Sequence, residues 1–343
     1  MGWLGRGRFR NHVRIVAGLT VGIASGCSLV VGLDDHQGLD PASEGGIDGN
    51  TNPDGGGGGD TGTGDTDGGG GKPDAPPSGC ATGSGFGTPE QVTFANGAGN
   101  PNSLRGIAGK QTVYVTSDNV PGAKAGSHVF TASRAGTTGA FSGPTPLNGN
   151  VNSTDDQRNA MATDDEFQLF YIQGDGGPLG NIWYAKRDAA TDFATTGYIL
   201  GLPQDHLYQD VYEIHRGSYI YVVSKKGGSL DIYESERSGS TYGALAAIAG
   251  IDTQDDEFAP VVNEDATVLY FARRGADLRA QIYGATGHSD FTTFSGAVAT
   301  CNLYGAGESA YPTWLSSDGK TLYYVRYTGS GPRTLWQVAT PGG

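Results

Sequence analysis

Short runs of alternating aromatic and β-branched residues recur along residues 81–343, and Gly, Asp, Asn or Ser bounds each run. Such alternation predicts β-strands, and the turn residues between them predict antiparallel connections. No apolar period of 3.6 residues persists between capping residues in this region, so helices are not expected. The strands of the first kind are Thr112–Val115, Gln168–Ile172, Ser218–Val222, Thr267–Phe271 and Thr321–Val325.

A second kind of strand follows each of these at a nearly constant distance. Its copies are Ser127–Thr131, Asn181–Ala185, Asp231–Glu234, Gln281–Gly284 and Thr334–Val338. By subtraction of residue numbers, their central apolar residues, from Val129 to Leu335, are spaced by 53, 50, 50 and 53 positions. About four short strands in each repeat of roughly 50 residues is the pattern of a β-propeller blade. The sequence therefore predicts an all-β fold of five blades.

A third, outer kind of strand suggests how the ring closes. Its copies begin with Phe or Tyr and are Phe86–Val92, Phe141–Leu147, Phe193–Ile199, Tyr242–Ile248 and Phe291–Ala297. The first copy has no blade before it, and the last blade has no outer strand after it. We therefore expect the N-terminal strand to complete the C-terminal blade, which leaves no open sheet edge.

The first 26 residues have the composition of an export signal. Four arginines precede the apolar run Ile15–Ala24, which is typical of a secretory signal peptide. The tetrapeptide that ends at Cys27 resembles the lipobox of bacterial lipoproteins, in which a lipidated Cys becomes the mature N-terminus. The resemblance implies a lipid anchor at Cys27 and, because Ser28 follows, a place at the outer membrane of the cell envelope. An uncleaved membrane span is the alternative, since residues 15–33 are about long enough to cross a bilayer.

Composition changes sharply after Cys27. Residues 34–80 contain ten acidic residues against Lys72 alone, are rich in Gly and contain no aromatic residue. Such a segment cannot bury enough apolar surface to offset the entropy of ordering. We expect residues 27–80 to be a disordered acidic tether and residues 81–343 to form the propeller domain. The net charge of −14 argues against a nucleic-acid partner.

Three cysteines are present in the chain. If Cys27 carries a lipid, Cys80 and Cys301 remain, and an oxidising compartment favours a disulfide between them. Such a bridge would join the start of the propeller to the segment before its last blade. Two unpaired buried cysteines are the alternative.

Loops that enter the innermost strands converge at one end of a propeller channel, and eight acidic residues are candidates for that position. They are Asp155, Asp156, Asp205, Asp210, Asp255, Asp256, Glu257 and Glu308, beside Asn102 and Arg105 from the first blade. An acidic ring could hold a hard cation such as Ca²⁺, which prefers six to eight oxygen ligands. It could also supply the carboxyl pair of a glycoside hydrolase, with Asp156, Asp205 and Glu257 as candidates. In the plainer alternative, these acids cap turns.

Two repeats resemble a known family. Residues 259–271 and 311–325 resemble the TolB-like, WD-like β-propeller repeat of bacterial envelope proteins, and a Cys with a Gly/Asp tether before a propeller resembles lipoproteins of myxobacteria. Together these features predict a membrane-anchored envelope protein that binds a protein partner or an envelope glycan at the channel mouth, without a cofactor. The alternatives are an arabinanase-like, five-bladed glycoside hydrolase and a structural envelope lipoprotein, so the sequence leaves open whether the chain is an enzyme.

Overall fold

The computed structural model describes residues 85–341, with gaps at 108, 122, 124, 137, 148–149, 153–154, 175–177, 188–191, 200, 204–205, 215–216, 226–227, 289 and 301–302. The expected signal and tether, the three cysteines and Asp205 lie outside the described residues, as do the boundaries expected at residues 26 and 80. Within the described part, no helix is long and apolar enough to cross a membrane.

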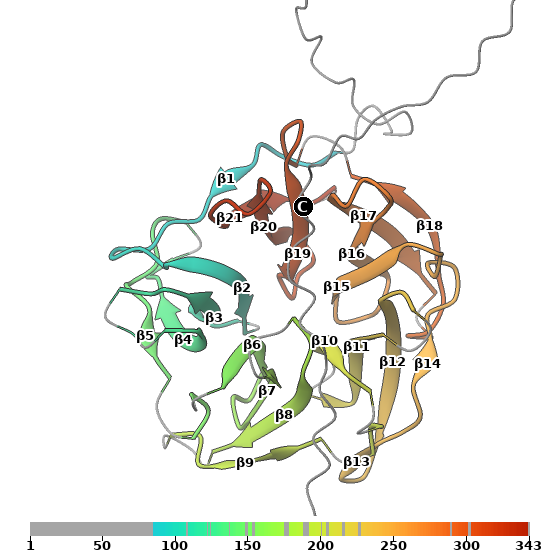
Figure 1. Ribbon diagram of the computed structural model, residues 1–343, viewed down its shortest axis with the longest axis horizontal. Helices are drawn as coiled ribbons and strands as arrows, with labels where there is room; N and C mark the ends of the chain where they lie inside the picture. Colours follow the sequence, from blue (N-terminus) through green and yellow to red (C-terminus); the bar gives the residue numbers. More distant parts are fainter. Residues whose placement is uncertain are drawn as a thin grey trace, which may run out of the picture. The chain divides into compact units, whose positions relative to one another are not determined.

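The described strands form five antiparallel sheets that are arranged radially around a channel (Figure 1). Blade 1 contains β2 (Asn100–Gly106), β3 (Thr112–Asp118), β4 (Ser127–Ser133) and β5 (Thr145–Pro146). Blade 2 contains β6 (Asp156–Ala162), β7 (Gln168–Gly174), β8 (Asn181–Lys186) and β9 (Thr195–Tyr198). In both blades the order of the strands in the sheet is the order along the chain.

The other three blades repeat this plan. Blade 3 contains β10 (Tyr208–Ile214), β11 (Tyr219–Ser224), β12 (Asp231–Ser238), β13 (Thr241–Tyr242) and β14 (Ala246–Ala247). Blade 4 contains β15 (Asp256–Val262), β16 (Val268–Arg274), β17 (Ala280–Gly287) and β18 (Phe294–Ala299). Blade 5 contains β19 (Ser309–Leu315), β20 (Thr321–Tyr327) and β21 (Thr334–Ala339), and its outer strand is β1 (Glu90–Gln91).

The pairing of β1 with β21 closes the ring. Glu90 lies opposite Gln337 in the antiparallel register. Flanking backbone bonds extend the contact, from the N–H of Gly87 to the Ala339 carbonyl at 2.9 Å and from the N–H of Val92 to the Leu335 carbonyl at 2.9 Å. The prediction of a five-bladed propeller that is closed by the N-terminal strand is confirmed.

The outer edge of blade 3 differs from the single strand expected over residues 242–248. There β13 pairs with the end of β12, whereas β14 pairs with Tyr233 and Glu234 nearer its middle. The chain leaves the ladder at Gly243, whose carbonyl accepts a hydrogen bond from the Ser235 hydroxyl at 2.9 Å. The side-chain bond thus substitutes for a backbone bond, and the strand is split in two.

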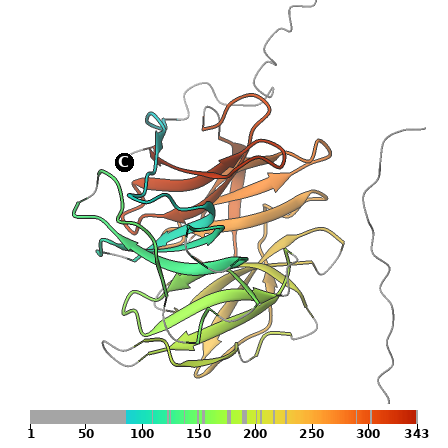
Figure 2. The same cartoon turned by 60° about the vertical axis from the view of Figure 1, so that its left-hand side comes forward.

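The core lies between neighbouring blades, where the sheets pack face to face (Figure 2). Aromatic residues of the strand that follows the innermost strand of each blade fill it. Tyr221 in β11 and Tyr324 in β20 are examples, and both are fully buried. Their hydroxyls donate hydrogen bonds to the backbone carbonyls of Phe291 at 2.7 Å and Leu303 at 2.8 Å, so each buried polar tip has a partner. The aromatic pattern in the sequence therefore builds the contacts between blades.

Candidate binding site at the channel mouth

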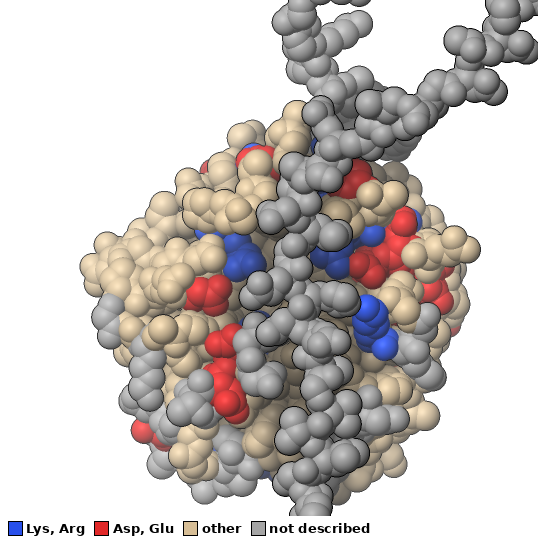
Figure 3. All heavy atoms as spheres, viewed as in Figure 1, with Lys and Arg blue, Asp and Glu red and all other residues tan. Residues whose placement is uncertain are grey.

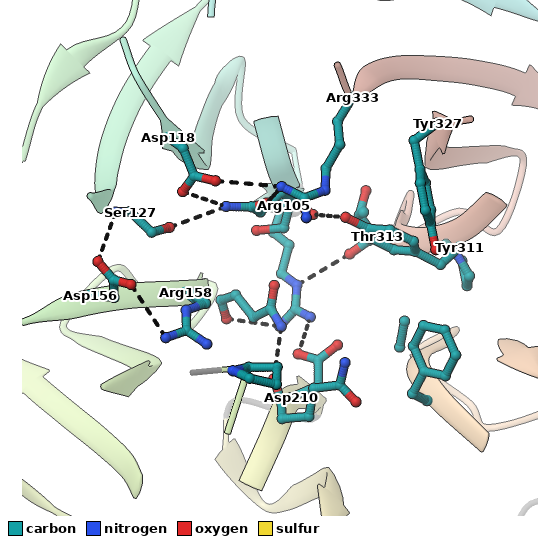
Figure 4. Close-up of a pocket in the computed structure, with 18 of the residues that line it drawn as sticks. Arg105, Asp118, Ser127, Asp156, Arg158, Asp210, Tyr311, Thr313, Tyr327 and Arg333 are labelled. Atoms are coloured by element: carbon teal, nitrogen blue, oxygen red, sulfur yellow. Dashed lines mark hydrogen bonds and ion pairs between the residues drawn. The ribbon is translucent and has the colours of Figure 1, made fainter. Parts of the chain in front are cut away.

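A cavity of about 380 Å³ opens at one end of the central channel (Figure 4). It is lined by residues of the inner strand of every blade, that is β2, β6, β10, β15 and β19. Each inner strand has a break in its pairing register at a residue that lines the cavity or directly beside one, and such bulges bend a strand and redirect its side chains. The breaks lie between Pro101 and Ser103, Arg158 and Met161, Tyr208 and Asp210, Phe258 and Val261, and Pro312 and Trp314. The bulges thus expose backbone carbonyls and side chains of five blades to a single space.

Arg105 of β2 forms the floor of this cavity and is only 1% exposed. Its guanidinium donates hydrogen bonds to the carbonyl oxygens of Thr313 in β19 and Asn159 in β6, each at 3.2 Å, and to that of Val211 in β10. Its Nη2 atom lies 2.6 Å from Oδ1 of Asp210 (Figure 4). A single side chain of blade 1 therefore connects blades 2, 3 and 5 across the channel.

Asp210 is the counterion of this floor. Burial raises the pKa of its carboxyl group, while Arg105 and the N–H of Val211, at 2.7 Å from Oδ1, act in the opposite direction. Arg105 also lies over the ring of Tyr212, at 5.3 Å from the ring centroid. Because a buried charge is tolerated only with a partner and hydrogen bonds, we interpret Asp210 as a structural element of the floor.

The rim of the cavity contains Asp118 at the end of β3. One of its oxygens accepts a hydrogen bond from Nδ2 of Asn102 at 2.9 Å, and the other lies 3.4 Å from Nη1 of Arg333. The same Nη1 donates to Oδ1 of Asn102 at 2.6 Å. Asn102 and Arg333 thus hold the carboxylate from two sides.

Two further arginines reach the cavity, each with a carboxylate neighbour. Oδ2 of Asp156 lies 3.5 Å from Nη2 of Arg158, and its Oδ1 accepts the N–H of Ser127 at 3.0 Å. Arg274 contacts one oxygen of Asp256 through Nη2 at 2.6 Å and Nε at 3.2 Å. Burial would raise the pKa of Asp256, but the hydrogen bonds from Arg274 prevail and lower it.

One wall of the cavity is aromatic. The ring of Tyr311 lies 6.0 Å from that of Tyr327 and 6.2 Å from that of Phe258, between ring centroids. In the same lining, Oγ of Ser103 and Oε1 of Gln209 are buried without a hydrogen-bond partner among the described residues. Buried polar atoms of this kind are normally satisfied by water or a ligand.

Of the eight acids expected at the mouth, Asp156 and Asp210 line the cavity. Asp205 lies outside the described residues. The others lie outside the lining and are Asp155, Asp255, Asp256, Glu257 and Glu308. The lining combines four arginines with three aspartates, a formal charge of +1 in a chain of −14. The mouth therefore differs from the acidic ring that the sequence suggested, and Figure 3 shows acidic and basic side chains together around the channel.

Sequence reasoning missed Arg158, Arg274 and Arg333, although a signal for part of this arrangement exists. Arg274 lies directly opposite Asp256 in the β15–β16 register. Glu308 and Arg326 have the same sequence separation, 18 residues, and are also ion-paired, with Nε of Arg326 at 3.0 Å. An acid at the start of an inner strand and an arginine at the end of the next strand therefore predict a cross-strand pair.

Among the described residues, one group of acids could hold a metal ion, and none of its three members lines the cavity at the mouth. The ligand oxygens of Asp231, Asp252 and Glu257 lie within 4.8 Å of one another. Nε of Arg273 already lies 2.7 Å from Glu257, and the Thr253 hydroxyl is bonded to the same carboxylate at 2.5 Å. Calcium binding by this protein stays a prediction.

At the opposite end of the channel, a much smaller cavity of about 30 Å³ is lined by Glu213, Asp164 and Glu264 together with apolar residues. Glu213 is 4% exposed, and its Oε1 atom has no hydrogen-bond partner among the described residues. Burial raises the pKa of Glu213 to about 8, with Asp164 and Glu264 adding to the rise and the N–H of Gly217 opposing it. This acid is therefore largely protonated at neutral pH.

The sequence matches no protein-family model and no curated protein. Similar solved structures include TolB from Acinetobacter baumannii, with 8% sequence identity and a TM-score of 0.41, over 70% of this chain and 54% of that one. A putative TolB from Agrobacterium tumefaciens has 14% identity and a TM-score of 0.41, over 75% of this chain and 78% of that one. Another is the catalytic domain of the GH62 α-L-arabinofuranosidase of Coprinopsis cinerea, with 13% identity and a TM-score of 0.47, over 76% of this chain and 98% of that one. This chain spans about half the length of the A. baumannii protein. The β-propeller assignment itself follows from the strand pairing of this chain.

Proposed function

We propose that this chain is a membrane-anchored binding protein of the bacterial cell envelope and that its channel mouth recognises a saccharide of the envelope. The cavity of about 380 Å³ carries this proposal. It lies near the lower end of the range of ligand pockets, about 300–1,000 Å³, which suits a small number of sugar rings. The export and anchoring features of the N-terminal sequence support the cellular location.

The lining suits a sugar because it combines many hydrogen-bonding groups with an aromatic wall. The arginines retain N–H donors, and the hydroxyl of Ser103 and Oε1 of Gln209 have no partner of their own among the described residues. Tyr327 and Tyr311 present rings beside these groups. A saccharide has hydroxyls for the first set and C–H faces for the second.

The hydrolase alternative has less support from the described residues. It requires a protonated and an ionised carboxyl that both face the substrate. Asp118 and Asp156 are each bonded to two donors, and Asp210 lies beneath Arg105. Glu257 lies outside the lining. We therefore favour binding over catalysis.

A protein partner is the second candidate, and two exposed leucines favour it. Leu207 precedes β10 and is 51% exposed, and Leu278 lies between β16 and β17 and is 77% exposed. Both belong to segments at the mouth end of their strands. If a protein binds here, Leu278→Ala should weaken its binding, whereas the same substitution should leave saccharide binding unchanged.

The test measures binding of the full chain, in detergent micelles, to polysaccharide extracted from a Gram-negative envelope. We expect Tyr327→Ala to reduce affinity about tenfold or more, because it removes part of the aromatic wall. Tyr198→Ala is the matched control, since Tyr198 is 44% exposed on the outer strand β9. Absence of polysaccharide binding, or an equal loss in both variants, would contradict the proposal.

A further inference from the structure

At the rim of the cavity, the carboxylate oxygens have hydrogen-bond partners, whereas some arginine N–H groups have none among the described residues. Both oxygens of Asp118 and both oxygens of Asp156 have a donor within 3.5 Å. The arginines opposite them retain donors, because a guanidinium has five N–H groups. Among the described residues, Arg158 has a single hydrogen-bond partner for its side chain, Asp156, and that contact is long, at 3.5 Å.

The other two rim arginines have the same surplus. Arg274 donates hydrogen bonds from Nε and Nη2 to one oxygen of Asp256. Arg333 donates from Nη1 to Asn102 and Asp118. Their side chains are 34% and 35% exposed, against 14% for Arg158, so solvent or a ligand can reach them. The three guanidinium groups come from blades 2, 4 and 5, and Figure 4 shows Arg158 and Arg333 on different sides of the cavity.

The buried lining adds a second observation. Arg105 fixes a fourth positive charge at the floor, and Ser103 is 1% exposed with a hydroxyl that has no partner among the described residues. Each of the four arginines has one aspartate partner, because Asp256 pairs with Arg274 from just outside the lining, so the charges balance and the excess lies in guanidinium N–H donors. A surplus of guanidinium donors that converges on one cavity is the arrangement by which proteins bind carboxylate and phosphate groups.

We propose that the ligand of this mouth is an acidic saccharide, whose oxyanion, a carboxylate or a phosphate, is held by Arg158, Arg274 and Arg333. This inference rests on the proposed saccharide-binding function and specifies its ligand. The anion accepts hydrogen bonds from those N–H groups of the three arginines that the rim aspartates leave without a partner. The uncharged part of the sugar lies against Tyr311 and Tyr327.

The experiment compares three forms of one envelope polysaccharide extract as ligands of the full chain in micelles. One is untreated, one has its carboxyl groups reduced to alcohols, and one has its phosphates removed by hydrofluoric acid. Loss of affinity by about tenfold or more on carboxyl reduction alone identifies a carboxylate, and the same loss on phosphate removal alone identifies a phosphate. Equal affinity for all three forms overturns the acidic ligand but leaves the saccharide-binding function standing. No binding of the untreated extract overturns both.

A charge-neutral variant tests the residues. Arg158→Gln with Arg274→Gln should lose about tenfold or more in affinity for the untreated extract and should no longer distinguish the three forms. Arg279→Gln is the control, because Arg279 lies in the β16–β17 loop, is paired with Asp277 and is outside the lining. Equal affinity of the double variant and the control would overturn the role of these arginines.

A salt series on the unmodified protein needs no variant and protects the test against a folding defect. Affinity for the acidic form should fall as the salt concentration rises from 0.05 to 0.5 M, because screening weakens partly exposed ion pairs. Affinity for the neutralised form should stay constant. A salt-independent affinity for the acidic form would overturn the proposal.

Discussion

The two ends of the channel are lined by the same five inner strands, but they differ in the surroundings of their acidic residues. At the mouth, about 380 Å³ of space is lined by four arginines and three aspartates, and each of these aspartates contacts an arginine. At the opposite end, about 30 Å³ remains, and Glu213 is buried there with an oxygen that lacks a partner among the described residues. The mouth pairs each acid with an arginine, whereas burial at the narrow end raises the pKa of Glu213 to about 8.

The difference follows from what each end can place beside a carboxyl group. Near the mouth, the bulges of the inner strands bring backbone carbonyls and arginines of several blades together. At the narrow end, the lining beside Glu213 contains Trp314, Met161 and other apolar residues and the two further acids Asp164 and Glu264, and none of the described residues in it is basic. The mouth therefore holds paired charges around a cavity, whereas the narrow end holds a buried acid in a much smaller space.

The largest expected effect comes from the floor of the mouth. Arg105→Ala leaves Asp210 buried without its counterion, so we expect the free energy of unfolding to fall by about 3–5 kcal/mol in urea denaturation. The double variant Arg105→Met with Asp210→Asn removes both charges and should recover part of this loss. If Arg105→Ala cost less than about 1 kcal/mol, the floor would not be held by this pair.

The next effect concerns the narrow end and its pH dependence. The folded-state pKa of Glu213, about 8, lies above its ordinary value of 4.5, so the folded state binds more protons between these values. Stability should therefore decrease as pH rises from 5 to 8, by about 2–4 kcal/mol from this group, since each pKa unit corresponds to about 1.4 kcal/mol. Glu213→Gln should flatten this slope in thermal unfolding, and Glu90→Gln, at an exposed position on β1, is the control. An unchanged slope in Glu213→Gln would show that this acid is not the buried titrating group.

A smaller effect tests whether packing closes the narrow end. A Cβ atom at Gly106 would lie 2.2 Å from the indole of Trp314, so Gly106→Ala should force the ring to move and cost about 1–3 kcal/mol in unfolding free energy. Gly136→Ala is the matched control, because its Cβ would have no neighbour within 4 Å. Equal stability of the two variants would mean that the indole can shift without cost.

The smallest effect on stability is expected at the rim. Arg158 and Asp156 approach only to 3.5 Å, so Arg158→Gln should change the unfolding free energy by about 0.5 kcal/mol or less. Denaturation in parallel with Arg105→Ala measures the contrast between rim and floor. A cost of several kcal/mol would place Arg158 among the structural residues and not among those available to a ligand.

Much of the fold could be predicted because its signal is local and repeated. The alternation of aromatic and β-branched residues around Tyr221 and Tyr324 predicted the strands β11 and β20, and the extra outer strand at 86–92 indicated how the ring closes. The site was less predictable. Asp156 and Asp210 were expected near the mouth and line the cavity, but the pairing of each with an arginine was not predicted.

The sequence by itself determined the all-β class, the blade number and the closure, because strand patterns have a period of two residues and need only neighbouring positions. Apart from cross-strand pairs such as Asp256 and Arg274, only the tertiary structure decided which charges meet. Arg105 and Asp210 are 105 positions apart in the chain, and the three rim arginines belong to three different blades. Which partner a buried charge finds depends on ring closure and on bulges that redirect side chains, and neither is encoded at the position of the charge itself.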